Sequence, residues 1–447
     1  MPYIPHTEND TTAMLSYIGL KAIDELFVDI PADMRPKSFN FPDGLSEHEA
    51  LARMEELAAK NAVHALSFLG AGAYDHTIPA AVDALAARGE FYTSYTPYQP
   101  EASQGTLQAI FEYQTAVCRL LDMDVANASV YDGGSAIFEA GMMAVRATGR
   151  GVILVDECVN PIYRNILTTL SSSLPVSLRF VPHKQGASDL AALEAALNEA
   201  GDSIAAVVVQ NPGFFGLVQD FSEFFAKIKA AQAKAIMLVN PVMQAVLKTS
   251  GEMGADVAVA EGQAIGMPLA FGGPYLGIMA CTKEMVRQMP GRIVGRTVDL
   301  EGKTGYVLTL QAREQHIRRA KATSNICSNQ GLCALRSAIH LSLLGPEGLT
   351  RTAELSMQRA REAAAALTAL PGVSLYNGAP YGYEFALALP KAASEVVGAL
   401  TRQKIVAGLP VGRWYAGLEN VLLVACTEKT TPGHIDSLAV ALSGALK

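Results

Sequence analysis

The densest group of side chains that could do chemistry lies in the string SYTPYQPE, residues 94–101. Pro97 and Pro100 stiffen this segment, and a stiff polar loop is suited to holding a small polar ligand. The alternative is an interface loop, because tyrosines commonly supply contact area between subunits. The density of polar groups favours a site that is shared with a partner chain. In that site we expect Tyr95, Tyr98 and Glu101 to be catalytic through hydrogen bonds and proton transfer, with Thr96 and Gln99 at the substrate or the interface.

Two glycine-rich strings could approach an anion. Gly133-Gly134-Ser135 begins an apolar helical run, where backbone N–H groups and the helix dipole could hold a phosphate. The alternative is an ordinary helix start with Ser135 at or near the cap. Gly272-Gly273 precedes Pro274 after a predicted strand; glycine permits close backbone approach, although a tight turn fits equally well.

Two arginines and a group of amides follow later in the chain. Arg292 and Arg296 lie four residues apart in GRIVGR and could bind one anion together, although most exposed arginines are solvated or paired on the surface. The side chains of Asn325, Asn329 and Gln330 precede a long predicted helix and could cap it or reach a crevice between domains. We expect Arg292, Arg296 and Asn325 at the substrate or the interface.

The thiols and imidazoles predict no chemistry of their own. Cys327 is not expected to be a nucleophile, because no histidine lies near it in the sequence to activate it. Six cysteines without CxxC spacing indicate neither a disulfide framework nor a zinc site. His64, His76 and His316 have no metal-ligand spacing and are expected to be structural, so we predict no metal.

These candidates must be held by a large α/β domain, because short apolar runs alternate with amphipathic ones from about residue 128. Such alternation predicts crossover units and a mostly parallel sheet that is buried on both faces. Asp156, Gln210 and Asn240 end three of the runs, which places them at the carboxyl edge where open α/β sheets bind ligands. The predicted strands are residues 152–156, 178–181, 204–210, 235–240, 257–261 and 276–280.

Helical patterns surround this central region. Ser46 and Glu49 form a capping box before an apolar stripe, and residues 106–121 predict a second amphipathic helix. After about residue 325, helices at 332–344 and 352–370, strands at 384–389 and 421–425, and a last helix after Pro432 predict a small α+β domain. We therefore expect an N-terminal helical arm with an interface loop (1–105), a large α/β domain (106–325) and a small C-terminal domain (326–447).

Size and composition narrow the class of protein. At 447 residues the chain is long enough for a large domain plus a smaller one. Half of its residues are apolar and 17% are charged, which suggests that a partner covers part of the surface. A net charge of −8 disfavours binding to nucleic acid or to a membrane surface, since both require a basic field. The N-terminus has no signal-like pattern, so we expect a cytoplasmic protein.

Seven local strings carry a more specific signal. They are SYTPYQPE (94–101), SQGTLQAIFEYQ (103–114), YDGGSAIFEA (131–140), QNPGFFG (210–216), EGQAIGMPLAFGGPYLG (261–277), GRIVGRTVD (291–299) and TSNICSNQ (323–330). Together, and in this order, they resemble the glycine decarboxylase P-protein family of the glycine cleavage system, in its N-terminal half or separate first subunit. The resemblance runs from about residue 4 to the end and implies the major fold of pyridoxal-phosphate (PLP) enzymes, fold type I.

The resemblance also implies which cofactor groups this chain lacks. Catalytic halves of the family deliver an Asp to the pyridine nitrogen and a His-Lys pair whose Lys forms the Schiff base. By the string GADV (254–257), the Asp position falls on Asn240 and the pair on Gln263-Ala264. PLP chemistry needs an amine and a protonated ring, so we expect no Schiff base here and at most a vestigial anion site at Gly133–Ser135. Gly272 and Gly273 would then lie near the PLP phosphate of a partner.

The leading hypothesis is a subunit without cofactor that pairs with a homologous PLP-bearing subunit, as two of each. By resemblance, the partner's PLP takes glycine, carbon dioxide leaves, and the aminomethyl group passes to the lipoyl arm of H-protein. One alternative is an independent fold type I PLP enzyme that uses Lys248 or Lys283. Another is a noncatalytic subunit that stabilises or regulates its partner.

Overall fold

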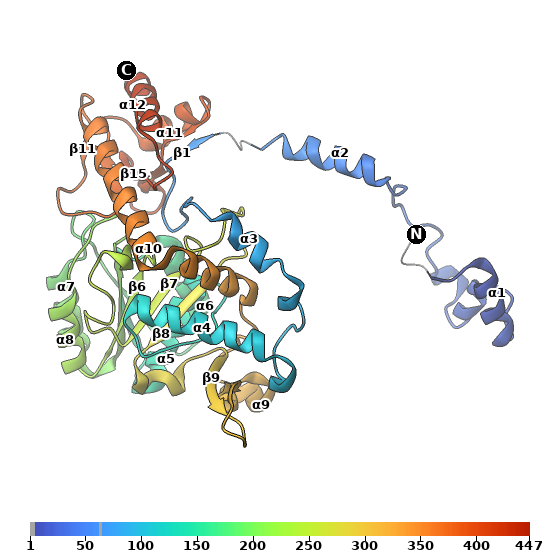
Figure 1. The fold of residues 1–447 in the computed structure, drawn as a ribbon. Helices are drawn as coiled ribbons and strands as arrows, with labels where there is room; N and C mark the ends of the chain where they lie inside the picture. Colours follow the sequence, from blue (N-terminus) through green and yellow to red (C-terminus); the bar gives the residue numbers. More distant parts are fainter. Residues whose placement is uncertain (1–4, 62–64) are drawn as a thin grey trace. The chain divides into compact units, whose positions relative to one another are not determined.

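The computed structural model describes residues 5–61 and 65–447, and its contacts divide the chain into two compact units, 1–63 and 64–447 (Figure 1). The first unit contains α1 (Glu8–Tyr17), the 3-10 helices η1 (Ile23–Phe27) and η2 (Ala32–Met34), and α2 (Glu47–Ala58). The predicted capping box is confirmed, because Ser46 and Glu49 exchange side-chain and backbone hydrogen bonds at the start of α2.

The first unit does not bury its own apolar side chains. Leu15 is the one buried apolar residue among the described part of this unit, whereas Met34, Phe39 and Phe41 are each about three-quarters exposed or more. Apolar surface of this kind is normally covered by another protein surface. The described part of this unit therefore consists of helices without a core of their own.

The second unit is built on a seven-stranded sheet in the order β2-β8-β7-β6-β5-β3-β4. Strands β4, β3, β5, β6 and β7 are parallel, as predicted. Strand β8 runs antiparallel to them, and the short edge strand β2 pairs antiparallel with β8. The reversal of β8 was not predicted; it arises because a loop without a crossover helix connects it to β7. The strands are β2 (Val125–Ala126), β3 (Val152–Asp156), β4 (Ser177–Val181), β5 (Ile204–Asn211), β6 (Lys234–Val239), β7 (Val257–Glu261) and β8 (Gly277–Cys281).

Helices cover both faces of this sheet (Figure 1). Side chains alternate along each strand, so Val207 and Val209 of β5 join one apolar core while Val208 joins another. The first core packs under α4 (Gln104–Leu121), α7 (Leu190–Ala200) and α8 (Ser222–Ala230), and the second under α5 (Gly133–Thr148) and α6 (Pro161–Ser171). Burial on both faces explains why the strands appear in the sequence as continuous apolar runs.

The C-terminal part contains a four-stranded antiparallel sheet in the order β11-β12-β15-β14. The two helices predicted at 332–344 and 352–370 form one long element, α10 (Gly331–Thr368), which kinks at Gly345 where φ is +62°. Glycine accepts this conformation and Pro346 follows it at once, so the kink lies where the prediction left its gap. The other elements are β11 (Ser374–Leu375), β12 (Glu384–Ala388), α11 (Ala393–Thr401), β14 (Leu409–Pro410), β15 (Val421–Ala425) and α12 (Pro432–Leu446).

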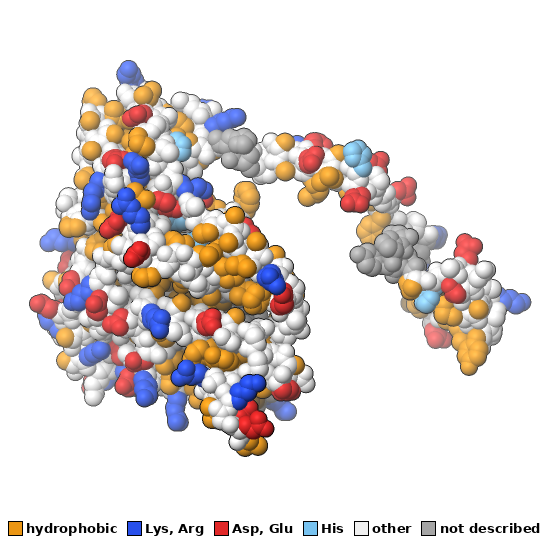
Figure 2. Space-filling view, in the orientation of Figure 1, with side chains coloured by type: hydrophobic (Ala, Val, Ile, Leu, Met, Phe, Trp, Pro, Cys, Tyr) orange, Lys and Arg blue, Asp and Glu red, His pale blue; other side chains and the backbone are white. Residues whose placement is uncertain are grey.

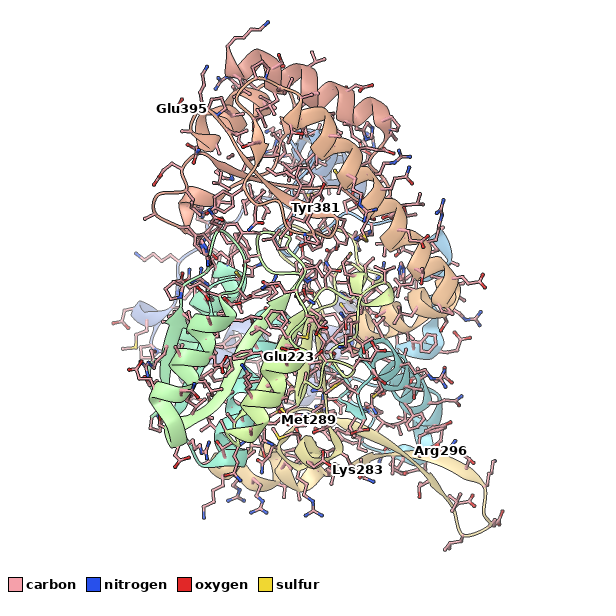
Figure 3. All side chains as sticks on the ribbon, turned by 90° about the vertical axis from the view of Figure 1, so that its left-hand side faces the viewer. Glu223, Lys283, Met289, Arg296, Tyr381 and Glu395 are labelled. Carbon is pink, nitrogen blue, oxygen red and sulfur yellow. The ribbon has the colours of Figure 1, made fainter. Side chains whose placement is uncertain are left out.

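A β-hairpin of β9 (Ile293–Val298) and β10 (Thr304–Thr309) projects from the second unit (Figure 3). The sequence patterns did not predict it, and Leu300 at its tip is fully exposed. None of the helices in the described ranges is long and apolar enough to cross a membrane. The predicted domain boundaries at residues 105 and 325 remain predictions.

Candidate functional site

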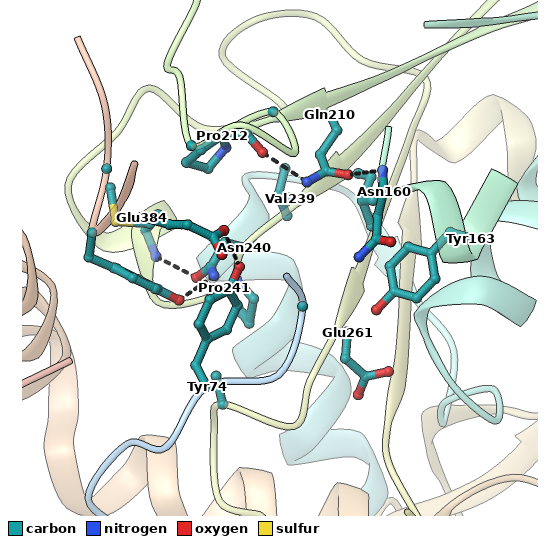
Figure 4. Close-up of a pocket in the computed structure, with 18 residues that line it drawn as sticks. Tyr74, Asn160, Tyr163, Gln210, Pro212, Val239, Asn240, Pro241, Glu261 and Glu384 are labelled. Atoms are coloured by element: carbon teal, nitrogen blue, oxygen red, sulfur yellow. Dashed lines mark hydrogen bonds between the residues drawn. The ribbon is translucent and has the colours of Figure 1, made fainter. Parts of the chain in front are cut away.

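A pocket lies at the carboxyl edge of the large sheet, where the sequence predicted a ligand site (Figure 4). Its walls come from the ends of β5, β6 and β7, from the start of α6, and from a loop that carries Tyr74. Tyr383 and Glu384, at the start of β12, close it from the C-terminal part. The open space between these side chains is about 40 Å³, which is enough for only a few water molecules.

Asn240 and Ala264, two of the positions to which the resemblance assigns cofactor groups, line this pocket, and Gln263 bonds to Tyr74 beside it. Asn240 follows β6, donates from Nδ2 to the hydroxyl of Tyr383, and accepts from the backbone N–H of Val242 at 3.0 Å. Gln263 accepts from the N–H of Tyr74 at 2.9 Å and donates to a backbone carbonyl. Ala264 lines the pocket as a small buried side chain. The amides at the Asp and His positions thus bond to the protein itself.

Neither of the lysines considered for an independent enzyme reaches the pocket. Lys248 is exposed, and its Nζ donates to the Ser222 hydroxyl at 2.6 Å. Lys283 follows β8, which runs antiparallel, so it lies at the opposite edge of the sheet from the pocket (Figure 3). Among the described residues, no lysine lines this pocket.

Two buried carboxylates take part in the pocket instead. Glu384 accepts from the N–H of Ala71 at 2.6 Å and from the Tyr74 hydroxyl at 2.8 Å. Burial raises the pKa of Glu384 to about 7, and these two hydrogen bonds limit the rise. Burial likewise raises the pKa of Glu261 to about 7. With two acids, no amine and little space, the lining does not fit PLP.

The loop 94–101 lies elsewhere, beside a second cavity of about 480 Å³. Tyr95 is 92% exposed and lines this cavity with the first residues of α10 and one side of α4. Glu101 belongs to a short 3-10 helix (Pro100–Ala102) and is also exposed, as is Gln99, whereas Thr96 is half-buried. Hydrophobic side chains gather on this face, over α4 and the first half of α10 (Figure 2).

Tyr98 differs from the other residues of the loop, because Arg292 holds it. The Arg292 guanidinium donates to the Tyr98 hydroxyl at 3.3 Å and lies over its ring, and it also donates to the carbonyl of Cys327 at 2.8 Å and to Asn329 Oδ1 at 3.3 Å. His316 packs edge-on against the same ring. The structure therefore unites the loop with the string TSNICSNQ through one arginine.

The predicted pairing of Arg292 with Arg296 does not occur. Arg296 is exposed on the projecting hairpin (Figure 3), and four residues along an extended strand separate the two backbones by roughly 13 Å. Asn325 is exposed. Asn329 does not cap α10 but donates to the carbonyl of Ala128 at 2.8 Å, because this segment packs back against the residues before α5.

The two glycine-rich strings differ in what their backbone groups contact. Asp132, and not Ser135, caps α5 by accepting from the Ser135 N–H at 2.7 Å. Gly133 instead donates its N–H to Glu261. Gly272 and Gly273 lie in the loop between β7 and β8 with φ of +115° and +130°, in open surroundings that leave their backbone accessible.

The remaining candidates are structural or outside the described residues. Cys327 is exposed, and His64 lies outside the described ranges. His76 is buried and bonds through Nδ1 to Glu428 at 2.6 Å.

The sequence patterns did not predict either of the pocket carboxylates, Glu261 and Glu384, although each is an acid at one end of an apolar strand, in VAVAE and EFALA. That pattern was the available signal.

The contact between His76 and Glu428 provides a test of what stabilises the C-terminal part. Burial alone would raise the pKa of Glu428, but the hydrogen bond and charge of His76, with the N–H of Thr77, lower it to about 2. A depressed carboxyl pKa contributes stability above the unfolded value of about 4.5, and this contribution is lost as the pH falls towards 2. We expect Glu428→Gln to lower the unfolding free energy by about 3 kcal/mol at pH 7, because it breaks a buried pair.

Urea unfolding at several pH values measures this effect. The difference between Glu428→Gln and the natural chain should shrink between pH 4.5 and 2, as the natural carboxylate takes up its proton. The matched control is Glu354→Gln, which removes an exposed pair with Arg351 and should change little. A difference that does not depend on pH would contradict the assignment.

Comparisons with known proteins agree with this architecture. The family profile described as "Glycine cleavage system P-protein" matches residues 1–442. The chain is 65% identical over 446 residues to "Probable glycine dehydrogenase (decarboxylating) subunit 1" of Nitratidesulfovibrio vulgaris strain Hildenborough, with 100% of both chains covered.

Solved structures indicate the same family and fold. A crystal structure of glycine decarboxylase (P-protein) of the glycine cleavage system, in inhibitor-bound form, superimposes with a TM-score of 0.92 at 43% identity and full coverage of both chains. Glutamate decarboxylase of Lactobacillus brevis reaches a TM-score of 0.69 at 12% identity, over 95% of this chain and 96% of that one, which shows the shared PLP-transferase fold alone. The chain belongs to the glycine cleavage system P-protein family.

Proposed function

We propose that this chain is a subunit of a heteromeric glycine dehydrogenase (decarboxylating) and that a second, PLP-bearing subunit supplies the cofactor. The observation that carries the proposal is the pocket at the carboxyl edge of the sheet, whose lining has Asn240 and Ala264 at the two cofactor positions and no lysine among the described residues. The assembly would contain two copies of each subunit. PLP in the partner would provide the electron sink that decarboxylation requires.

The chain's own contribution would come from the loop 94–101. Tyr95 and Glu101 are exposed, and their hydroxyl and carboxylate are free to meet a partner's substrate. Arg292 fixes the position of Tyr98 in the same loop, so the segment is preorganised on one side and open on the other. We infer that this loop completes the partner's site for glycine and helps to receive the lipoyl arm of H-protein.

The uncovered arm supports an obligate partner. The apolar side chains of residues 5–61 and those over α4 and α10 would be buried in the complex. Gly272 and Gly273, with accessible backbone, would then approach the partner's PLP phosphate. A subunit that only stabilises its partner would need the apolar surfaces but not the polar loop.

Borohydride reduction tests the first part of the proposal. After incubation of the full-length chain with equimolar PLP, reduction and mass analysis should find no lysine that is labelled stoichiometrically, because the pocket holds none. The PLP-bearing subunit, treated in the same way, is the positive control. One stoichiometric pyridoxyl-lysine in this chain would refute the proposal and favour the independent PLP enzyme.

A further inference from the structure

The N-terminus of α5 meets the end of β7 at a buried carboxylate. Glu261 Oε2 accepts from the N–H of Gly133 at 3.0 Å, and Oε1 accepts from the N–H groups of Gln263 at 3.0 Å and Leu276 at 3.1 Å. The residue is only 9% exposed. Three backbone donors from two different segments therefore converge on one side chain, which stands on the wall of the pocket (Figure 4).

Glycine at position 133 makes this convergence possible. A Cβ there would lie 3.0 Å from the Cβ of Glu261 and 3.1 Å from its backbone nitrogen, closer than packed atoms comfortably approach. The end of β7 thus rests against the first turn of a helix of 16 residues, where the helix dipole and unpaired N–H groups attract an anion. Asp132 accepts from the N–H of Ser135, so the N–H groups of Gly133 and Ser135 both have acceptors from the chain itself.

We propose that Glu261 is an internal anion that occupies the phosphate position of this fold and closes the pocket to phosphorylated ligands, PLP among them. A phosphate at the same place would have to displace the carboxylate from three N–H donors. If the carboxylate remained, the two anions would be neighbours in a buried site, where like charges repel strongly. The open space beside Glu261 is small, about 40 Å³.

Occupation of the anion position by Glu261 has a consequence that the missing lysine does not have. Loss of the lysine removes the covalent bond to PLP but leaves a pocket that could still hold the cofactor through its phosphate. Occupation by Glu261 removes that anchor as well. Phosphate binding is a property of the isolated chain, so its assay succeeds or fails independently of turnover in a complex.

Equilibrium dialysis of the full-length chain against inorganic phosphate tests the proposal. At pH 8, above the pKa of about 7 for Glu261, the natural chain should bind no phosphate. Glu261→Ala should bind about one per chain, because it frees the N–H donors and empties the site. Its thermal midpoint should rise by about 2 °C in phosphate relative to chloride at equal ionic strength.

The matched control is Glu139→Ala. Glu139 is a buried carboxylate of the same helix, but it accepts from the Ser324 hydroxyl at 2.6 Å, so its removal frees no backbone N–H group. This variant should bind no phosphate. Phosphate binding by Glu139→Ala equal to that of Glu261→Ala would overturn the proposal, as would binding by the natural chain or a folded Glu261→Ala that binds none.

A second variant keeps the test decisive if Glu261→Ala does not fold. Glu261→Gln preserves the volume, but its amide group offers one acceptor atom where the carboxylate offers two. Hydrogen exchange of the peptide that contains Gly133 should become at least several-fold faster than in the natural chain. Unchanged exchange in this folded variant would show that the carboxylate does not hold the N-terminus of α5.

Discussion

Glycine decarboxylation is expected to be undetectable with this chain alone and to appear only when the PLP-bearing subunit is added. No side chain of a protein can replace the electron sink that the cofactor supplies, and among the described residues no lysine lines the pocket to bind it covalently. We expect the rate of carboxyl exchange between glycine and bicarbonate to differ by more than a thousandfold between the two samples, within the range of typical enzymatic accelerations of about 10⁶ or more. Lipoylated H-protein should raise the rate of the complete mixture greatly.

Two controls accompany this measurement. The PLP-bearing subunit is assayed alone, so that the contribution of this chain is measured directly, and association of the two purified subunits is followed by sedimentation. Robust exchange by this chain without its partner would refute the proposed function. Failure of the two subunits to associate would count equally against it.

The second prediction concerns the loop 94–101, in which Tyr95→Phe and Glu101→Gln should each lower turnover of the complex by about ten- to a thousandfold. The physical reason is that each substitution removes one positioned hydrogen bond or proton-transfer group and leaves the backbone unchanged. Both side chains are exposed in the isolated chain, so the substitutions should not disturb its fold.

Tyr92→Phe is the matched control for this pair. Tyr92 is another exposed tyrosine that lines the same cavity of about 480 Å³ but stands outside the loop 94–101, and its variant should turn over glycine normally. Tyr98→Phe is less informative, because the Tyr98 hydroxyl also accepts from Arg292 and its loss would loosen the loop. If Tyr95→Phe and Glu101→Gln both assemble normally and retain the full rate, the loop is only structural. That result would favour the alternative of a noncatalytic subunit that stabilises its partner.

The strands of the large sheet and the residues of the pocket show how much the sequence alone could predict. The apolar runs at 152–156, 204–210 and 257–261 predicted strands that the structure confirms to within one residue, because a strand buried on both faces must be apolar along its whole length. Asn240 and Gln263-Ala264 were placed by the family's order of strings alone; Asn240 and Ala264 line one pocket, and Gln263 bonds to Tyr74, which lines it too. Local pattern and family resemblance were sufficient for these positions.

Other expectations failed because spacing along the chain does not fix distance in space. Arg292 and Arg296 looked like a pair at four residues apart, which would be neighbours on a helix, but the segment is extended and separates them. Asn329 looked like a helix cap, yet it bonds to Ala128, which is 201 residues away in the chain. In both cases a long-range contact replaced the local one.

The sequence by itself determined the family and the fold class, because these depend on residue identity and order. Only the tertiary structure decided which distant groups meet at the pocket. Glu261 meets Gly133 across 128 residues of chain, and Glu384 reaches Ala71 and Tyr74 across more than 300. Such contacts arise when β7, α5 and β12 pack together, and burial then sets the pKa of each acid. No periodicity or spacing within the sequence records which distant backbone groups a buried carboxylate will find.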